Sequence, residues 1–199
     1  MKFSVLLAPS LYISTIVAGR SGSALTMDPE ASNVLWTATK MTGDHTGSVP
    51  VKSGTHKFSG ADLESARINL DMIGIISSDI DDEGKKAKFF GHLKHADLFD
   101  LENHAEASFT ARAVENIVHA ASGRPNYRVT GDHTIKGITL RTTFDRLFWM
   151  DGKTARGADN FTFDRAKHDI KYRSGTFFPE IGDKVISDTI SLTFDVSAK

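Results

Sequence analysis

The chain has no cysteine among its 199 residues, and this absence removes several kinds of chemistry at once. Disulfide bonds, thiolate catalysis, iron–sulfur clusters and cysteine-ligated zinc all require this side chain. A chain without cysteine also gives no sign of the redox compartment in which it works. The stability of the fold must therefore come from packing and hydrogen bonds.

An excess of charge of either sign is also absent. The 24 basic and 25 acidic residues leave a net charge of −1, so no broad positive field attracts nucleic acid. The sequence contains no G-x-G-x-x-G loop, no P-loop and no G-x-S-x-G nucleophile elbow. We therefore expect neither nucleic-acid partners nor nucleotide cofactors.

Eight histidines make a metal site or acid–base catalysis the first alternatives to consider. His92 and His95 are three residues apart, whereas a zinc-protease helix places two histidines four residues apart with a glutamate between them. Acid–histidine neighbours occur, as at Asp132-His133, but no nucleophile motif accompanies them. We predict no catalytic residue, no metal site and no resident cofactor.

The long hydrophobic run of the sequence is confined to its N-terminus. Lys2 precedes an apolar run over residues 3–18, which Pro9 interrupts, and the small residues Gly22 and Ala24 fit a small-x-small cleavage site. The run is too short and too broken to span a bilayer. We predict a signal peptide over residues 1–24, with a retained N-terminal extension as the alternative. The mature domain would cover residues 25–199 without a transmembrane segment and would be exported, to the periplasm if the source is Gram-negative.

From Asn33 onward, apolar and polar residues alternate with a period of two, which is typical of antiparallel strands. In residues 67–72, Ile68, Leu70 and Met72 fall on one face and polar residues on the other. Similar segments continue to the end of the chain, including residues 169–173 and 188–196. The sequence predicts an all-β, mainly antiparallel fold of about eight strands, which closes into either a barrel or a sandwich.

One stretch breaks this pattern, near residues 85–99. Acidic residues precede it, which suits the start of a short helix over residues 85–93. A helix of about two turns is marginal by itself. Its apolar residues are therefore expected to plug a larger structure, such as the mouth of a barrel. They are Phe89, Phe90, Leu93, Leu98, Phe99 and Leu101.

Residues 91–100 (GHLKHADLFD) resemble the HLKSxDFFD turn of the YceI-like family, which comprises exported bacterial, lipocalin-like barrels that bind polyisoprenoid lipids. Further similar stretches follow in family order over residues 28–199. They are residues 32–40 with 45–47, 131–137 (GDHTIKG), 163–175 (FDRAKHDIKYRSG) and 183–194 (DKVISDTISLTF). The chain departs from the family pattern at Leu98, at His104-Ala105 and at His133.

The resemblance implies an extended lipocalin-like barrel with a tunnel for an isoprenoid tail. A barrel of about eight strands is just wide enough to be filled by side chains or to hold one elongated ligand. Alternation alone favours the filled core, whereas the resemblance favours the tunnel. The residues expected to line the tunnel are Trp36, Ile68, Leu70, Met72, Phe109, Phe144, Phe148, Ile190, Leu192 and Phe194. The residues considered for a headgroup are His45, Lys136 and Arg165, each of which has a purely structural role as its alternative.

The function that follows is non-catalytic binding of an amphipathic isoprenoid, quinone-like or polyprenyl-phosphate lipid, for transport, storage or protection. Each buried methylene contributes about 0.8 kcal/mol, so some twenty carbons give a gross term of about 16 kcal/mol. Two alternatives stay open: a small enzyme that uses the pocket with a histidine, and a solidly packed structural stress protein. The sequence decides neither the identity of the lipid nor whether the protein forms a homodimer.

Overall fold

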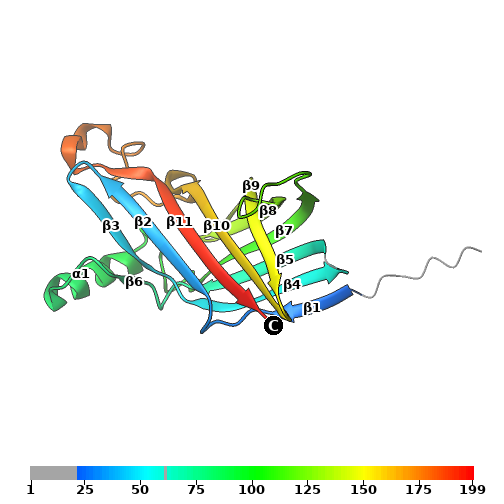
Figure 1. Ribbon diagram of the computed structural model, residues 1–199. Helices are drawn as coiled ribbons and strands as arrows, with labels where there is room; N and C mark the ends of the chain where they lie inside the picture. Colours follow the sequence, from blue (N-terminus) through cyan, green and yellow to red (C-terminus); the bar gives the residue numbers. More distant parts are fainter. Residues whose placement is uncertain (1–21, 61) are drawn as a thin grey trace, which may run out of the picture.

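The structure is a computed structural model that describes residues 22–60 and 62–199. These residues form one antiparallel sheet of eleven strands, the helix α1 (Glu83–Lys94) and two short 3-10 helices, η1 (Arg165–His168) and η2 (Pro179–Lys184) (Figure 1). The strands are β1 (Gly22–Thr26), β2 (Asn33–Lys40), β3 (Gly43–Ser48), β4 (Val51–Ser59), β5 (Asp62–Asp71), β6 (Ile76–Ser77), β7 (Glu106–Asn116), β8 (Tyr127–Ile135), β9 (Ile138–Asp151), β10 (Thr154–Asp164) and β11 (Ile186–Ala198).

The predicted all-β antiparallel barrel with one short helical insertion is confirmed. The sheet has more strands than predicted because β1 and β6 are short and carry little alternation. Of the predicted signal peptide, residues 1–21 lie outside the described residues, and residues 22–24 belong to β1. The position of a cleavage site stays a prediction.

Side chains along the strands alternate between buried and more exposed positions, as the period of two in the sequence predicts. In β8, every second residue from Tyr127 to Ile135 is buried, whereas Arg128 between them is exposed. A bulge changes this parity in β5, where the register against β4 shifts by one residue. Because of that extra residue, Leu63 and Ala66 both point inward although they are three positions apart.

The predicted strand over residues 169–173 is wrong. This segment follows η1 and consists of turns, with Asp169 in the left-handed region at φ 57°. The Asp169 N–H donates to the carbonyls of Ala166 and Arg165, which ends η1 and leaves no extended backbone for a strand.

The strand order is β1-β4-β5-β7-β8-β9-β10-β11-β2-β3-β6, and the β3–β4 connection joins its two halves. The Val49 N–H donates to the Val34 carbonyl of β2 at 2.9 Å, and the Asp71 N–H of β5 donates to the Pro50 carbonyl at 2.9 Å. The sheet therefore curls back on itself, with β2, β3, β10 and β11 on one side and β4, β5, β7 and β8 on the other (Figure 1).

Met27 closes the barrel near the C-terminus. Its N–H donates to the Gly54 carbonyl of β4 at 3.0 Å, and the residue forms a β-bridge with Ala198 of β11. A Cβ at Gly54 would collide with the Met27 sulfur and would lie 2.6 Å from the Arg67 carbonyl oxygen. Only glycine allows this close approach of chain to chain.

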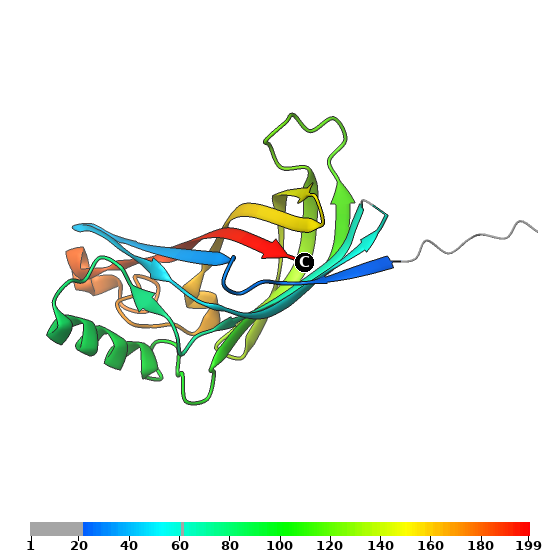
Figure 2. The ribbon, with the colours of Figure 1, turned by 60° about the horizontal axis from the view of Figure 1, so that its bottom comes forward.

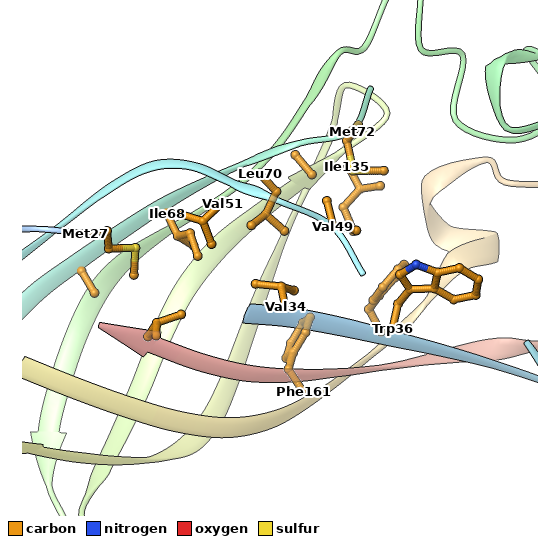
Figure 3. Close-up of a cluster of buried hydrophobic side chains, with 14 of the residues drawn as sticks. Met27, Val34, Trp36, Val49, Val51, Ile68, Leu70, Met72, Ile135 and Phe161 are labelled. Carbon is orange, nitrogen blue, oxygen red and sulfur yellow. The ribbon is translucent and has the colours of Figure 1, made fainter. Parts of the chain in front are cut away.

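The helix α1 lies near β6, at the end of the barrel away from the C-terminus (Figure 2). Asp82 caps the helix by accepting a hydrogen bond from the Lys85 N–H at 2.8 Å. Leu93 is the buried residue of the helix, and Phe89 and Phe90 pack against the core. Between its two ends, the barrel carries apolar side chains on its inner face, from Met27 to Trp36 (Figure 3).

Candidate functional site

The interior of the barrel is hollow beside α1, where a cavity of about 230 Å³ lies. Strands β2 and β5 contribute Trp36 and Leu70, and α1 contributes Phe89 and Leu93. The rings of Trp36 and Phe89 are stacked with their centroids 6.1 Å apart, so the helix packs directly on the sheet at this end. We call this space the outer compartment.

Trp36 can lie across the outer compartment because β3 has a glycine opposite it. A Cβ at Gly47 would overlap the Trp36 ring and the Ile76 carbonyl. The indole Nε1–H donates to that same carbonyl at 3.1 Å, which satisfies its only polar group while the ring is 7% exposed. The ring is thus fixed as a wall of the cavity.

A second cavity of about 70 Å³ lies further along the barrel, toward the C-terminus. We call it the inner compartment. Four residues line both compartments and form a waist between them: Leu70, Ala107, Ile135 and Leu192. The two compartments are therefore neighbours along the barrel, and we call the pair of them the channel.

Nine of the ten residues expected to line a tunnel line one of these compartments. The outer compartment has Trp36, Met72 and Ile190, the inner one has Ile68, Phe109, Phe144 and Phe194, and both have Leu70 and Leu192. Phe148 lines neither compartment. It is 3% exposed, and its ring packs 5.3 Å from Phe58 and 6.1 Å from Tyr127.

The polar groups of the outer compartment include His45. The Lys40 Nζ lies 3.0 Å from His45 Nε2, and since an ammonium only donates, the ring donates from Nδ1 to Asp79 at 2.6 Å. Partial burial opposes ionisation of Asp79, but hydrogen bonds from His45, Ser77 and the Thr46 N–H lower its pKa to about 2. The ionised Asp79 thus holds His45, which lines the outer compartment, by a hydrogen bond.

The other two headgroup candidates serve the fold. Arg165 lines the outer compartment, but its guanidinium donates to carbonyls of residues 170, 172, 186 and 187 and lies 3.4 Å from Asp188. Lys136 lines neither compartment. Its Nζ donates to the carbonyls of Ala96 and Asp169, and so ties the turn after α1 to η1.

Sequence reasoning missed three polar residues that line the inner compartment and are buried, which are His56, Arg146 and His133. The alternation that places Phe144 and Phe148 inside also places Arg146 inside, so this signal was present. Its guanidinium lies 5.9 Å from the Phe148 ring centre. Both ring nitrogens of His56 lack a hydrogen-bond partner among the described residues. Desolvation and the charge of Arg146 lower the pKa of His56 to about 3.

His133, where the chain departs from the family pattern, forms a buried pair with His168. Their Nε2 atoms lie 3.0 Å apart, and the His168 Nδ1 lies 3.2 Å from the Ile135 carbonyl. The Nδ1–H therefore donates to that carbonyl, and His168 accepts from His133 through Nε2. Desolvation and the neighbouring His168 lower the pKa of His133 to about 4. Both rings stay neutral near pH 7 and act as internal packing and hydrogen-bonding groups.

The described residues hold no group of three His, Asp or Glu side chains that could bind a metal ion. Nor does the part of the chain that the structure describes contain a helix long and apolar enough to cross a membrane. The channel offers walls that are mostly apolar, with a few hydrogen-bonding groups among them.

Solved structures share this fold. BcnA of Burkholderia cenocepacia superposes with a TM-score of 0.67 at 21% identity, over 87% of this chain and 99% of that one. A polyisoprenoid binding domain from Saccharophagus degradans gives 0.61 at 14% identity, over 88% and 97%. The YCEI protein of Campylobacter jejuni gives 0.51 at 15% identity, over 100% and 99%.

A curated relative, the UPF0312 protein PputW619_0484 of Pseudomonas putida (strain W619), is 33% identical over 73 residues. This match spans 37% of the chain and only 35% of the length of that relative. The family model of the YceI-like domain matches residues 25–198, and the chain therefore belongs to the YceI-like family.

Proposed function

We propose that this protein binds a lipid with a long apolar chain, of the isoprenoid type, and that it carries, stores or protects this lipid without transforming it. The observation that carries the proposal is the channel of two compartments, which meet at a waist of Leu70, Ala107, Ile135 and Leu192. The polyisoprenoid binding domain from S. degradans, which shares the fold, supports an isoprenoid as the ligand.

Both compartments are needed for tight binding. Each buried methylene contributes about 0.8 kcal/mol, so a tail of about ten carbons gives a gross term of roughly 8 kcal/mol. Association and ordering of the ligand cost about 4–15 kcal/mol, which offsets half of that term or more. A tail of about twenty carbons gains roughly 16 kcal/mol, and this exceeds the cost. The ligand should therefore extend past the waist.

The outer end offers a place for a headgroup. Lys40 and His45 line the outer compartment and are already hydrogen-bonded to each other. The Lys40 ammonium attracts a phosphate or carbonyl oxygen without a metal ion. Export, as predicted from residues 1–24, would give such a carrier access to lipids outside the cytoplasm.

Native mass spectrometry tests the proposal, with a long-chain polyprenol presented in vesicles to delipidated protein. Wild type should take up one lipid per chain. Ala107→Phe should not, because the added ring fills the waist, where Ala107 is 7% exposed. Ala113→Phe is the matched control, since Ala113 lies in the same strand and is exposed.

A wild-type spectrum that shows only the bare polypeptide would overturn lipid binding and favour the solidly packed alternative. Turnover of the bound molecule, or a metal ion in the spectrum, would favour the enzyme alternative. Equal uptake by both phenylalanine variants would remove the waist from the binding path.

A further inference from the structure

His56 is a buried polar group without a partner at the end of the inner compartment. Its side chain is 0% exposed, and neither Nδ1 nor Nε2 has a hydrogen-bond partner among the described residues. Leaving such a group unsatisfied opposes folding, so a buried histidine in this state calls for an explanation. The ring lines the inner compartment, which is where a ligand would meet it.

The inner compartment borders His56. Its neighbour across the strands in β5 is Ala66, a small residue that also lines the compartment. The centre of the His56 ring lies 5.5 Å from the centre of the Phe148 ring, so the two rings pack against each other. The histidine is thus fixed by packing beside a free volume of about 70 Å³.

A positive side chain lies in the same place. Arg146 lines the inner compartment, is 7% exposed, and contacts the same Phe148 ring as His56. A Cβ at Gly157 would collide with its guanidinium, so the glycine of β10 makes room for this charge inside the barrel. A neutral imidazole N–H and a guanidinium are both hydrogen-bond donors.

We propose that the inner compartment recognises a hydrogen-bond-accepting oxygen at the buried end of the lipid, held by the His56 N–H beside Arg146. This inference rests on the proposed function and narrows its ligand class. The lipid would be an apolar chain whose leading end carries a hydroxyl, carbonyl or carboxylate. The compartment measures about 70 Å³, which suits an oxygen carried by a single small group.

The test compares two probes of the same chain length, dodecane and a dodecanediol with a hydroxyl at each end. Whichever end of the diol enters first, it presents an oxygen to His56. Binding of both probes is measured by competition for wild type, His56→Phe and His56→Gln. Phenylalanine keeps the ring shape and removes both nitrogens, whereas glutamine retains an N–H donor.

Replacing His56 by phenylalanine should weaken diol binding about tenfold and leave dodecane binding unchanged, since only the diol loses a hydrogen bond. His56→Gln should bind the diol within about threefold of wild type, because one donor remains. In wild-type protein labelled with ¹⁵N-histidine, the diol should move the His56 ring resonances and dodecane should not.

Diol binding that is as tight in His56→Phe as in wild type would overturn the proposal, and so would unchanged His56 resonances in the diol complex. These outcomes leave the proposed function standing as long as dodecane binds. If neither probe nor a longer polyprenol binds wild type, the proposed function falls together with this inference.

Discussion

At the scale of single residues, the channel combines dry walls with a few polar groups whose environments differ. Asp79 is ionised and hydrogen-bonded beside the outer compartment. His56 is neutral, buried and unsatisfied at the inner one. The first group stabilises the folded state and the second destabilises it, so the two make opposite predictions for mutants.

Replacing His56 by phenylalanine should raise the free energy of unfolding of the ligand-free protein by about 1–3 kcal/mol at pH 7, since an unsatisfied buried group is removed. The folded pKa of His56 is lowered to about 3 from 6.5. Between these values the unfolded chain binds a proton that the folded chain does not, so stability falls as the pH is lowered.

In wild type, protonation of His56 in the unfolded chain lowers the free energy of unfolding by up to about 1.4 kcal/mol per pH unit. The His56→Phe variant should not show this decrease. Urea unfolding of wild type and His56→Phe from pH 7 to pH 3 measures both effects. A variant that is less stable than wild type at pH 7 would show that His56 is satisfied in the folded state.

Asp79→Asn should lower the free energy of unfolding at pH 7 by about 1 kcal/mol, since solvent screens the interactions of this exposed residue. The folded pKa of Asp79 is lowered to about 2 from 3.8, so its contribution is fully present above pH 4 and is lost as the pH falls toward 2. Wild type and variant should converge in urea unfolding curves recorded toward pH 2. Asp81→Asn, at an exposed position nearby, is the control and should match wild type throughout.

At the scale of elements, α1 is a short helix that depends on its cap and on its contacts with the sheet. Phe89 of α1 stacks on Trp36, and both rings line the outer compartment. The sequence predicted the helical insertion, and its apolar residues pack in or against the core. What it did not show is that Trp36 would be the residue beneath the helix, because that contact joins positions 53 apart in the chain.

Asp82→Ala should loosen α1 without unfolding the barrel. The variant removes the hydrogen bond from the Lys85 N–H at 2.8 Å, and loss of an N-cap costs about 1 kcal/mol. Amide hydrogen exchange over Glu83–Lys94 should accelerate about fivefold, whereas the strands keep their protection. Asp81→Ala is the matched control, and equal acceleration in both variants would argue against the capping role of Asp82.

At the scale of the whole molecule, the barrel depends on contacts between distant parts of the chain. Met27 joins β4 to β11 through Gly54 and Ala198, and the β3–β4 connection joins the two halves of the strand order. The strand order begins at β1 and ends at β6, so these contacts, and not pairing between the two end strands, hold the curled sheet together.

Gly54→Val should lower the free energy of unfolding by about 3 kcal/mol, since its side chain would overlap Met27 and the Arg67 carbonyl. Guanidinium unfolding measures the change. Gly91→Ala is the control, because a Cβ at Gly91 has no atom within 4 Å and alanine favours a helix. A stable Gly54→Val protein would mean that this end of the barrel opens readily.

The sequence by itself determined the β class, the inward face of most strands and the place of the helix, since these follow from local periodicity. It also located nine of the residues that line the two compartments. In a strand, neighbouring side chains point to opposite faces, so the apolar face that carries Leu70 or Phe194 is the inward one. The same alternation places His56 and Arg146 on the inward faces of their strands, but the prediction of lining residues included only apolar side chains.

Only the tertiary structure decided whether the interior is filled or hollow. A cavity is the volume left between side chains of different strands, and no periodicity within one strand measures that volume. The structure likewise gave His45 its partner Asp79 at 2.6 Å and tied Lys136 to the Ala96 and Asp169 carbonyls. These contacts join positions some 30 to 40 residues apart, and chain folding alone brings such groups together.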